Sequence, residues 1–461
     1  MAEGTLTSMI RKMVFKAEPY LPQVPKPKKK IPLQVRLLWC GVCLLIYMVM
    51  GQTPLFGATA PEFDFLAFAR VIFASQQGTL VELGIGPIVT AGLLMQLLRG
   101  SDILKFDFKK PEERGIFQTA TKMVTYIVIV AESIVYAVAV YGGPSEPFVL
   151  YVIIGQLMAA SIIIMFLDEL IQKGWGLGSG ISLFIMAGVA QQILWSLFSP
   201  LPAGDGGMIG IIPYTIESLI GSGDLGNVLF RSNQLPSIFG LCLTAGIILI
   251  LVFTQGMKIE IPIVSTKYRG FQAVYPIKMM YVSNIPVILA SALTANAVFV
   301  FQMIWSNFNP RNNNFFVNFI AQFDPTSPST PVGGLIYYVT PPRGLDVAAL
   351  DPMRGVGYVL FMIGIVVVFG KLWVELGGLS PKSAAQNLLD ADVQIPGFRR
   401  SNKPVEALLN KYIPSVTIIG SCILGLLAGV SDVLGVFGSG IGVLLMVDIM
   451  INYYTQLVRE Q

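Results

Sequence analysis

Histidine is absent from the 461 residues, and charged residues make up only 13% of the chain. Without histidine there can be no histidine-based catalytic triad, no HExxH zinc motif and no histidine proton relay. A soluble domain would carry about a quarter of its residues as Asp, Glu, Lys and Arg, whereas this chain is 54% hydrophobic. These shortages favour a multi-span membrane protein over a soluble enzyme.

Cysteine is also scarce. The four cysteines (40, 43, 242 and 422) fall in or beside apolar segments and show no repeated CxxC spacing. We therefore expect reduced cysteines packed among apolar residues, and neither a disulfide nor a metal site. No nucleotide-binding domain is visible, so we expect no cofactor.

The hydrophobic segments predict an all-α integral membrane protein. A membrane-spanning helix needs roughly 20 predominantly apolar residues. Ten such segments are expected, at residues 35–52, 79–98, 117–141, 148–171, 181–198, 237–256, 276–301, 355–376, 412–431 and 435–456.

The second crossing is preceded by a half-helix. Residues 63–74 are apolar but too short to cross, they carry Asp64 and Arg70, and a polar break follows at residues 75–78. Residues 79–98 are long enough to cross despite Gly84, Gly86 and Pro87. Non-helical backbone at membrane depth must be enclosed by protein or line a wet cavity, because unpaired N–H and C=O groups cost several kcal/mol in lipid. This stretch therefore predicts a hole in the middle of the protein.

The distribution of positive charge predicts the orientation. Ten crossings put both termini on one side, and with the N-terminus inside only five of the 31 Lys and Arg residues fall in outer segments. The positive-inside rule thus predicts cytosolic termini. Residues 1–34 are expected to form an amphipathic surface helix, at residues 6–17, and a basic linker. Two inner connections, residues 257–275 and 377–411, are longer than topology requires, which is typical of functional or disordered loops.

Three acids lie at membrane depth, where ionisable side chains are costly and are candidates for function. Glu375 and Asp448 lie near inner ends, so snorkelling into the interface is an equal alternative. Glu132 lies deeper, and we expect it to make a polar contact inside the bundle.

An internal repeat is faintly visible. Residues 178–184 and 438–444 share the sequence GSGI and open the fifth and tenth spans. Five spans per half is an odd number, so homologous halves would have opposite orientations in the membrane. Chance similarity between glycine-rich segments is the alternative.

Four blocks in the right order, at residues 83–98, 167–184, 275–296 and 437–445, resemble a known family. The chain resembles the alpha subunit of the Sec translocon, the SecY protein-conducting channel family, in its archaeal and eukaryotic branch. The resemblance implies ten transmembrane helices in two inverted five-helix halves, a short plug half-helix and a seam that opens into lipid. The parts implied are the N-terminal half at residues 35–198, the plug at 61–74, the external loop at 199–236, the C-terminal half at 237–456 and a cytosolic tail at 457–461.

The resemblance also implies functional residues. It assigns plug residues to Phe63, Phe65, Phe68, Arg70 and Ile72. It assigns an aliphatic pore ring to Ile85, Val89, Ile181, Ile185, Ile288 and Leu445. Two pairs in this ring have i,i+4 spacing and so face one way on a helix, although ordinary helix packing would give the same pattern.

Two further sets follow from the resemblance. A polar cluster at the lateral gate maps to Thr90, Glu132 and Asn296, and ribosome docking maps to Arg269 and Arg399.

The function implied is that of a pore-forming subunit, not an enzyme, which passes unfolded secretory polypeptides and releases transmembrane segments laterally into lipid. The implied partners are a gamma subunit of the SecE type, a beta subunit, the ribosome with its ribosomal RNA, a signal-sequence-bearing nascent polypeptide and the lipid bilayer. We favour the cell (plasma) membrane of an archaeon over the endoplasmic reticulum. The rival reading is a secondary transporter with inverted five-helix repeats, which the aliphatic waist disfavours. An intramembrane enzyme is disfavoured by the lack of histidine.

Overall fold

The computed structural model describes residues 5–29, 31–58, 70–101, 103–104, 106, 110–141, 147–203, 207–220, 228–231, 235–265, 272–282, 285–325, 327–342, 344–390, 393–394 and 402–460. The chain forms two compact units. The first contains Met1–Gln192, Ser291–Thr340 and Ile449–Gln461, and the second contains Ile193–Ala290 and Pro341–Asp448.

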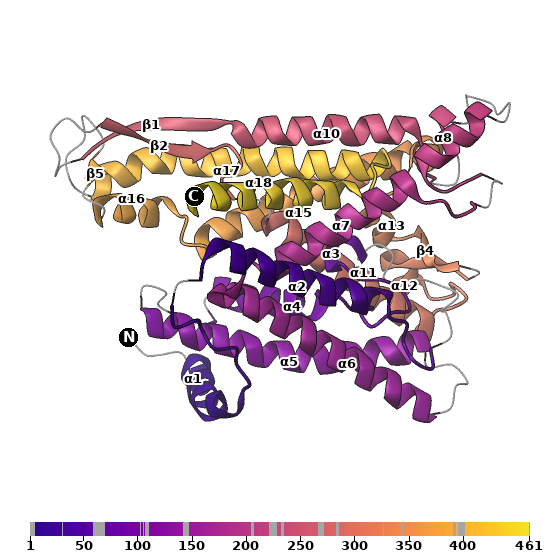
Figure 1. The fold of residues 1–461 in the computed structure, drawn as a ribbon, viewed down its shortest axis with the longest axis horizontal. Coiled ribbons are helices and arrows are strands. Elements are labelled where there is room, and N and C mark those ends of the chain that lie inside the picture. The colour runs from indigo at the N-terminus through magenta and orange to yellow at the C-terminus, as the bar shows by residue number, and fades with distance from the viewer. Residues whose placement is uncertain are drawn as a thin grey trace. The chain divides into compact units, whose positions relative to one another are not determined.

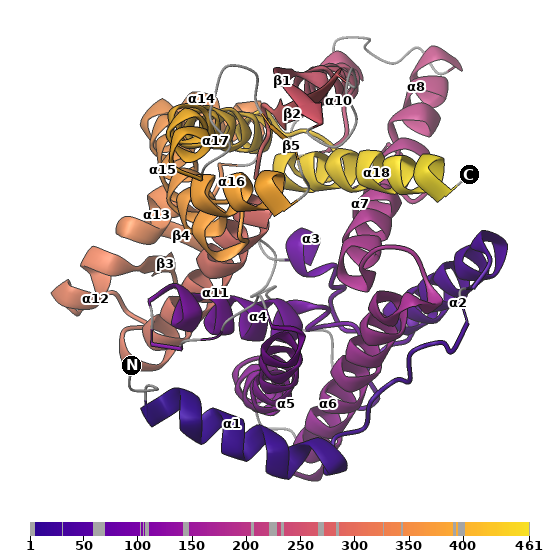
Figure 2. The same cartoon turned by 90° about the vertical axis from the view of Figure 1, so that its left-hand side faces the viewer.

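Helices dominate the first unit (Figure 1). Its elements are α1 (Thr5–Ala17), η1 (Glu18–Tyr20), α2 (Leu33–Gln52), α3 (Arg70–Phe73), α4 (Gly86–Gly100), α5 (Pro111–Tyr141), α6 (Pro147–Leu170), the π-helical turn η2 (Ile171–Trp175), most of α7 (Gly180–Phe198) and of α11 (Ile285–Phe308), α12 (Phe315–Ile320), β3 (Gln322–Asp324), β4 (Ser327–Gly333), α13 (Leu335–Val339) and the last part of α18 (Gly440–Glu460). The expected amphipathic helix at residues 6–17 is present as α1. It runs crosswise to α5, which is seen end-on where α1 is seen from the side (Figure 2).

The second unit combines long helices with a small sheet. Its elements are α8 (Ile211–Ile220), α10 (Ile238–Gly256), β1 (Lys258–Ser265), β2 (Gln272–Lys278), α14 (Leu345–Leu350), α15 (Pro352–Leu376), α16 (Pro381–Asp390), β5 (Val393–Gln394), α17 (Asn402–Val433) and the first part of α18.

Among the described residues, nine helices are long and apolar enough to cross a membrane. They are α2, α5, α6 with η2, α7, α10, α11, α15, α17 and α18. The expected class, an all-α membrane protein with many spans, is confirmed. The remaining expected crossing corresponds to α4, which has only 15 residues.

The expectation of a continuous helix over residues 79–98 is wrong. Residues 79–85 form turns, and α4 begins only at Gly86. Gly84 has a φ of +54°, in the left-handed region that a glycine adopts without strain. Pro87 fits the first turn of α4, but its ring would clash with the carbonyl group of residue 83 if the helix continued towards the N-terminus. The broken stretch is therefore longer than the sequence suggested.

The expected span at residues 276–301 began too early. Residues up to Lys278 belong to β2, and the helix is Ile285–Phe308. β2 pairs antiparallel with β1, from Lys258 opposite Lys278 to Val264 opposite Gln272. The alternating sequence KIEIPIVS in β1 is the strand signal that the sequence reasoning treated as loop.

The hairpin of β1 and β2 extends from the end of α10 (Figure 1). Its inward side chains Ile261 and Ile277 are 6% and 0% exposed and belong to an apolar cluster with Ala385 of α16 and Leu409 of α17. A connection expected to be a long loop thus includes two paired strands that pack against helices α16 and α17.

The two GSGI segments adopt matching structures. Gly178 and Gly438 have φ values of +67° and +75°, and helices α7 and α18 begin two residues after them. In the first unit, Asp168 Oδ1 accepts a hydrogen bond of 2.9 Å from the backbone N–H of Ile181. In the second, Asp432 Oδ1 accepts one of 2.7 Å from the N–H of Gly440. An acid from the preceding helix thus caps each N-terminus, which supports a true repeat over chance similarity.

Candidate functional site

The end of the half-helix is fixed by close backbone contacts. The carbonyl of Phe73 accepts a hydrogen bond of 2.9 Å from the N–H of Ile85, and a Cβ built on Gly84 would lie 2.0 Å from the same oxygen. The hydroxyl of Tyr47 donates to the carbonyl of Ala74. Only glycine fits at position 84, so the chain after α3 is clamped between α2 and the turns that precede α4.

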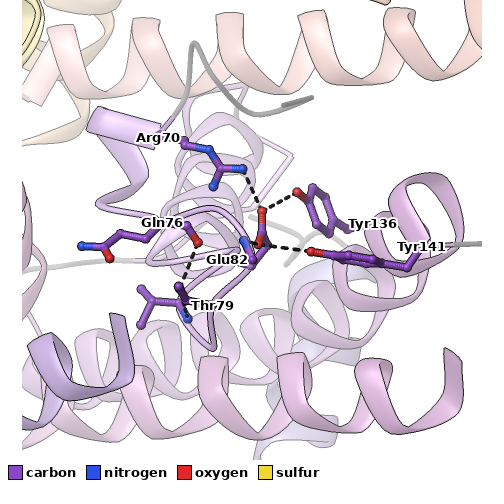
Figure 3. A network of polar contacts seen from close by, with 8 residues as sticks. Arg70, Gln76, Thr79, Glu82, Tyr136 and Tyr141 are labelled. Carbon is purple, nitrogen blue, oxygen red and sulfur yellow. Dashed lines mark hydrogen bonds and ion pairs between the residues drawn. The ribbon is translucent and has the colours of Figure 1, made fainter. Parts of the chain in front are cut away.

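A buried carboxylate, Glu82, joins α3 to α5 (Figure 3). Its side chain is fully buried, and its Oε1 lies 2.8 Å from Nη2 of Arg70 in an ion pair. The same oxygen accepts a hydrogen bond of 2.6 Å from the hydroxyl of Tyr136. The other oxygen accepts from the N–H of Gly78 and, at 3.4 Å, from the hydroxyl of Tyr141. We call these five residues the Glu82 network.

The Glu82 network satisfies both oxygens of an acid that is completely out of contact with solvent. Breaking such a buried pair by removing one partner typically costs about 3–5 kcal/mol, because a charge is left uncompensated. Arg70 is the residue that ties α3 into this network. The network therefore resists displacement of the half-helix from its position.

Sequence reasoning singled out Arg70 but missed Glu82. The missed signal was an acid within the apolar run TLVELGIGP, only twelve residues after an arginine of opposite charge. An acid inside the membrane is expected to pair with a basic or polar group. Applied to Glu82, this rule would have suggested its ion pair with Arg70. The two tyrosines could not have been found, because α5 approaches Glu82 only in the folded chain.

The three residues of the expected polar cluster come together in the first unit. Asn296 Nδ2 of α11 donates to Thr90 Oγ1 of α4 over 3.0 Å. Glu132 of α5 shares a side-chain hydrogen bond with Thr90. Next to these contacts, the rings of Tyr136 and Phe299 stack with centroids 6.0 Å apart. Polar contacts thus link helices α4, α5 and α11, and the role of these residues as a lateral gate stays a prediction.

The expected ring residues are divided between the units. Ile85, Val89, Ile181 and Ile185 lie in the first unit, and Ile288 and Leu445 lie in the second. Their exposed fractions are 0% for Ile85, Ile185 and Leu445 and 7% for Val89, whereas Ile181 and Ile288 are half-buried. The assignment of these residues to one ring stays a prediction.

Several expected site residues lie outside the described part of the chain. These are Phe63, Phe65 and Phe68 of the plug and both docking arginines, Arg269 and Arg399, and the same holds for the side chain of Ile72. Of the two acids near inner ends, Glu375 is exposed at the end of α15, as snorkelling predicts. Asp448 is buried in the second unit and accepts a hydrogen bond of 2.9 Å from Gln255 Nε2.

Many apolar helices, a broken second crossing and a short helix clamped inside its unit define a helical membrane channel with a plug. A model of the SecY family matches residues 79–454, and a model of the plug domain of Sec61p matches residues 45–78. The chain belongs to the SecY family, whose members are protein translocation channels and not enzymes.

Individual relatives agree with this result. The protein translocase subunit SecY of Pyrococcus furiosus is 38% identical over 465 residues, which cover 98% of this chain and 96% of the relative. A solved structure described as a protein conducting channel has a TM-score of 0.81 at 36% identity, covering 97% of this chain and 96% of the other. Sec61 in the canine ribosome-channel complex from the endoplasmic reticulum has a TM-score of 0.79 at 34% identity, with the same coverage.

Proposed function

We propose that this chain admits an unfolded secretory polypeptide from the cytosolic side, conducts it through the middle of the helical bundle and releases its apolar segments sideways into lipid. The observation that carries the proposal is the half-helix held by the Glu82 network, in a segment that matches the plug domain of Sec61p. A charged tether of this kind holds a plug in the closed state and yields when translocation displaces it.

We propose that an aliphatic ring seals the channel around the polypeptide. The proposed members are Ile85, Val89, Ile181, Ile185, Ile288 and Leu445. A narrow constriction lined by isoleucine, valine and leucine cannot replace the hydration shell of an ion and tends to dewet. It would therefore block ions while yielding to an extended chain, whereas a transporter of polar solutes would need polar groups at its midplane.

We propose that Thr90, Glu132 and Asn296 form the polar part of a lateral gate. The 3.0 Å contact between Asn296 and Thr90 supports this role, because it joins α4 to α11. Interhelical polar contacts in membranes contribute on average about 0.6 kcal/mol and at most about 2 kcal/mol. Contacts of this strength can hold a seam closed and still open when a signal sequence binds.

The proposed partners follow from the relatives. One relative is part of a ribosome-channel complex, and we propose that Arg269 and Arg399 contact ribosomal RNA. Arg269 belongs to the segment between β1 and β2, whose packed base would hold a docking loop away from the membrane. We also propose that the chain assembles with gamma and beta subunits in the cell membrane of an archaeon. Both termini would lie in the cytosol, and the chain would divide into two inverted halves.

A reconstituted transport assay tests the function. The chain is placed in vesicles with its gamma and beta subunits and given ribosomes that synthesise a secretory precursor. We expect the precursor to become protected from protease, and the same precursor without its signal sequence to remain accessible. Equal accessibility of both precursors would contradict the proposal, and uptake of a small solute instead would favour the transporter.

A further inference from the structure

A basic cavity lies where the N-terminal linker meets the first membrane span. Its volume is about 350 Å³, and it is lined by Pro27, Lys28, Lys29, Ile31, Arg36 and Gly174. Lys28 and Lys29 are exposed, and Arg36 is half-buried in the first turn of α2. Among the described residues, none with a negative side chain lines this cavity, so it concentrates positive charge at one end of a transmembrane helix.

Hydrogen bonds from side chains to backbone carbonyls hold the segments around the cavity in place. Trp175 Nε1 donates a hydrogen bond of 2.8 Å to the carbonyl of Pro25, and Arg36 Nε donates one of 3.1 Å to the carbonyl of Gly176. Lys122 donates to the carbonyl of Pro22 at the start of the linker. A cavity that is already formed loses little ordering entropy when a ligand binds.

The acid on the neighbouring helix is already neutralised. Glu169 of α6 forms ion pairs of 2.7 Å with Lys122 and 2.8 Å with Lys173. Within the described part of the chain, no carboxylate forms an ion pair with Lys28 or Lys29. The positive charges of Lys28 and Lys29 are therefore available to an external anion.

Two tryptophans mark the depth of the cavity in the bilayer. The rings of Trp39 and Trp175 are 5.7 Å apart and meet edge to face, one turn from Arg36 and next to Gly174 respectively. Tryptophan is enriched at the level of the lipid headgroups. The cavity therefore lies at headgroup level and not out in the aqueous phase.

An exposed apolar stripe begins beside the cavity and follows α2 across the membrane. It consists of Val35, Leu38, Val42, Leu45 and Val49, which are 39–63% exposed and spaced three and four residues apart. Such spacing places the five side chains along one face of a helix. An acyl chain can lie along this face while its headgroup occupies the cavity.

We propose that this cavity binds the anionic phosphate headgroup of a membrane lipid, through Lys28, Lys29 and Arg36, with an acyl chain along the stripe of α2. Basic pockets beside transmembrane helices on the cytosolic side suit anionic headgroups, and each Lys or Arg near the membrane surface adds to the attraction. Ribosomal RNA offers the same phosphate chemistry, but the tryptophans and the stripe favour a lipid.

Native mass spectrometry of the full chain tests the proposal, with phosphatidylglycerol as the anionic probe and phosphatidylcholine as the neutral one. We expect the wild type to retain phosphatidylglycerol preferentially, and Lys28→Gln with Lys29→Gln to weaken that preference roughly tenfold or more. The matched control is Lys403→Gln with Lys411→Gln, which removes two exposed lysines of α17 and should leave the preference intact.

Three results would overturn the proposal. The first is equal retention of both lipids by the wild type, and the second is an undiminished preference in the Lys28 and Lys29 variant. The third is displacement of phosphatidylglycerol by an excess of inorganic phosphate, which would assign the cavity to a soluble anion. If the variant loses ribosome binding but keeps its lipid preference, the site belongs to RNA instead.

Discussion

At the scale of single residues, one buried acid ties α3 to the rest of the first unit. Glu82 is fully buried and receives four donors, of which the charged one, Arg70, comes from α3. Removing both charges of the ion pair from water is costly, so the pair adds little to the overall free energy of unfolding. The ion pair instead favours one position of α3, because Arg70 reaches Glu82 only while α3 stays in that position.

We predict that Glu82→Gln loosens the plug. The neutral amide leaves the Arg70 guanidinium without its counter-ion, which should destabilise the closed state by about 3–5 kcal/mol. The ion conductance of the resting channel in planar bilayers should rise. Adding Arg70→Gln should reduce the conductance again, because no uncompensated charge remains.

Tyr141→Phe provides the matched control, since it removes the long 3.4 Å hydrogen bond to Glu82 and keeps the ion pair with Arg70. It should leave the conductance close to that of the wild type. Wild-type conductance in Glu82→Gln, at equal folded yield, would mean that the network does not hold the plug.

We predict that Gly84→Ala destabilises the fold of the first unit. A Cβ would lie 2.0 Å from the carbonyl oxygen of Phe73, and the φ of +54° is itself unfavourable for alanine by about 1–2 kcal/mol. The loss in free energy of unfolding should exceed about 2 kcal/mol. Gly92→Ala is the control, because nothing lies within 4 Å of its Cβ in α4. Thermal unfolding in detergent measures both, and equal midpoints would refute the clamp.

At the scale of elements, the sequence predicts which transmembrane helices exist better than it predicts where they begin. Long apolar runs identify helices because lipid permits little else. Nine of the ten expected spans therefore correspond to long apolar helices among the described residues. The starts of α4 and α11 were misplaced, because turns and strand residues before them are as apolar as the helices: residues 79–85 and β2 carry few charges. Their positions are set by tertiary contacts, such as that between Phe73 and Ile85.

We predict that Asn296→Leu lowers the barrier to opening between α4 and α11. The substitution removes the hydrogen-bond donor to Thr90 and should destabilise the closed state by about 0.5–2 kcal/mol of free energy. Signal sequences of lower hydrophobicity should then insert. Asn307→Leu on the same helix is the control, since the Asn307 amide donates to the carbonyl of Met303 within α11 and joins no second helix in the described part of the chain. Identical hydrophobicity thresholds at equal expression would rule the gate role out.

We predict that Arg269→Glu, in the connection between β1 and β2, weakens ribosome binding. The planar guanidinium suits bidentate contact with phosphate better than an ammonium does, so Arg269→Lys should weaken binding partly. Co-sedimentation at increasing salt measures the effect, which should be largest at low ionic strength and shrink as salt screens the contact with phosphate. Lys258→Glu, at the exposed base of the same hairpin, is the control. Wild-type binding by Arg269→Glu would refute the docking role.

At the scale of the whole molecule, composition and motif order were sufficient for the class and the family. The absence of histidine, the low charge and the four ordered blocks led to a SecY-type channel, which the family match over residues 79–454 confirms. The site was only partly predictable. The polar cluster followed from resemblance, whereas the Glu82 network depends on how α3, α5 and the turns before α4 meet in three dimensions.

The central claim is that a polypeptide crosses the membrane through the aliphatic ring. The most direct test is site-specific photo-crosslinking, with benzoylphenylalanine placed at Ile181 or Ile288 while a ribosome holds a stalled secretory chain. The control position is Leu249 of α10, which is 71% exposed and is expected to face lipid. We predict adducts with the secretory chain from both ring positions and none from Leu249. Adducts from Leu249 alone, or from none of the three, would contradict the account.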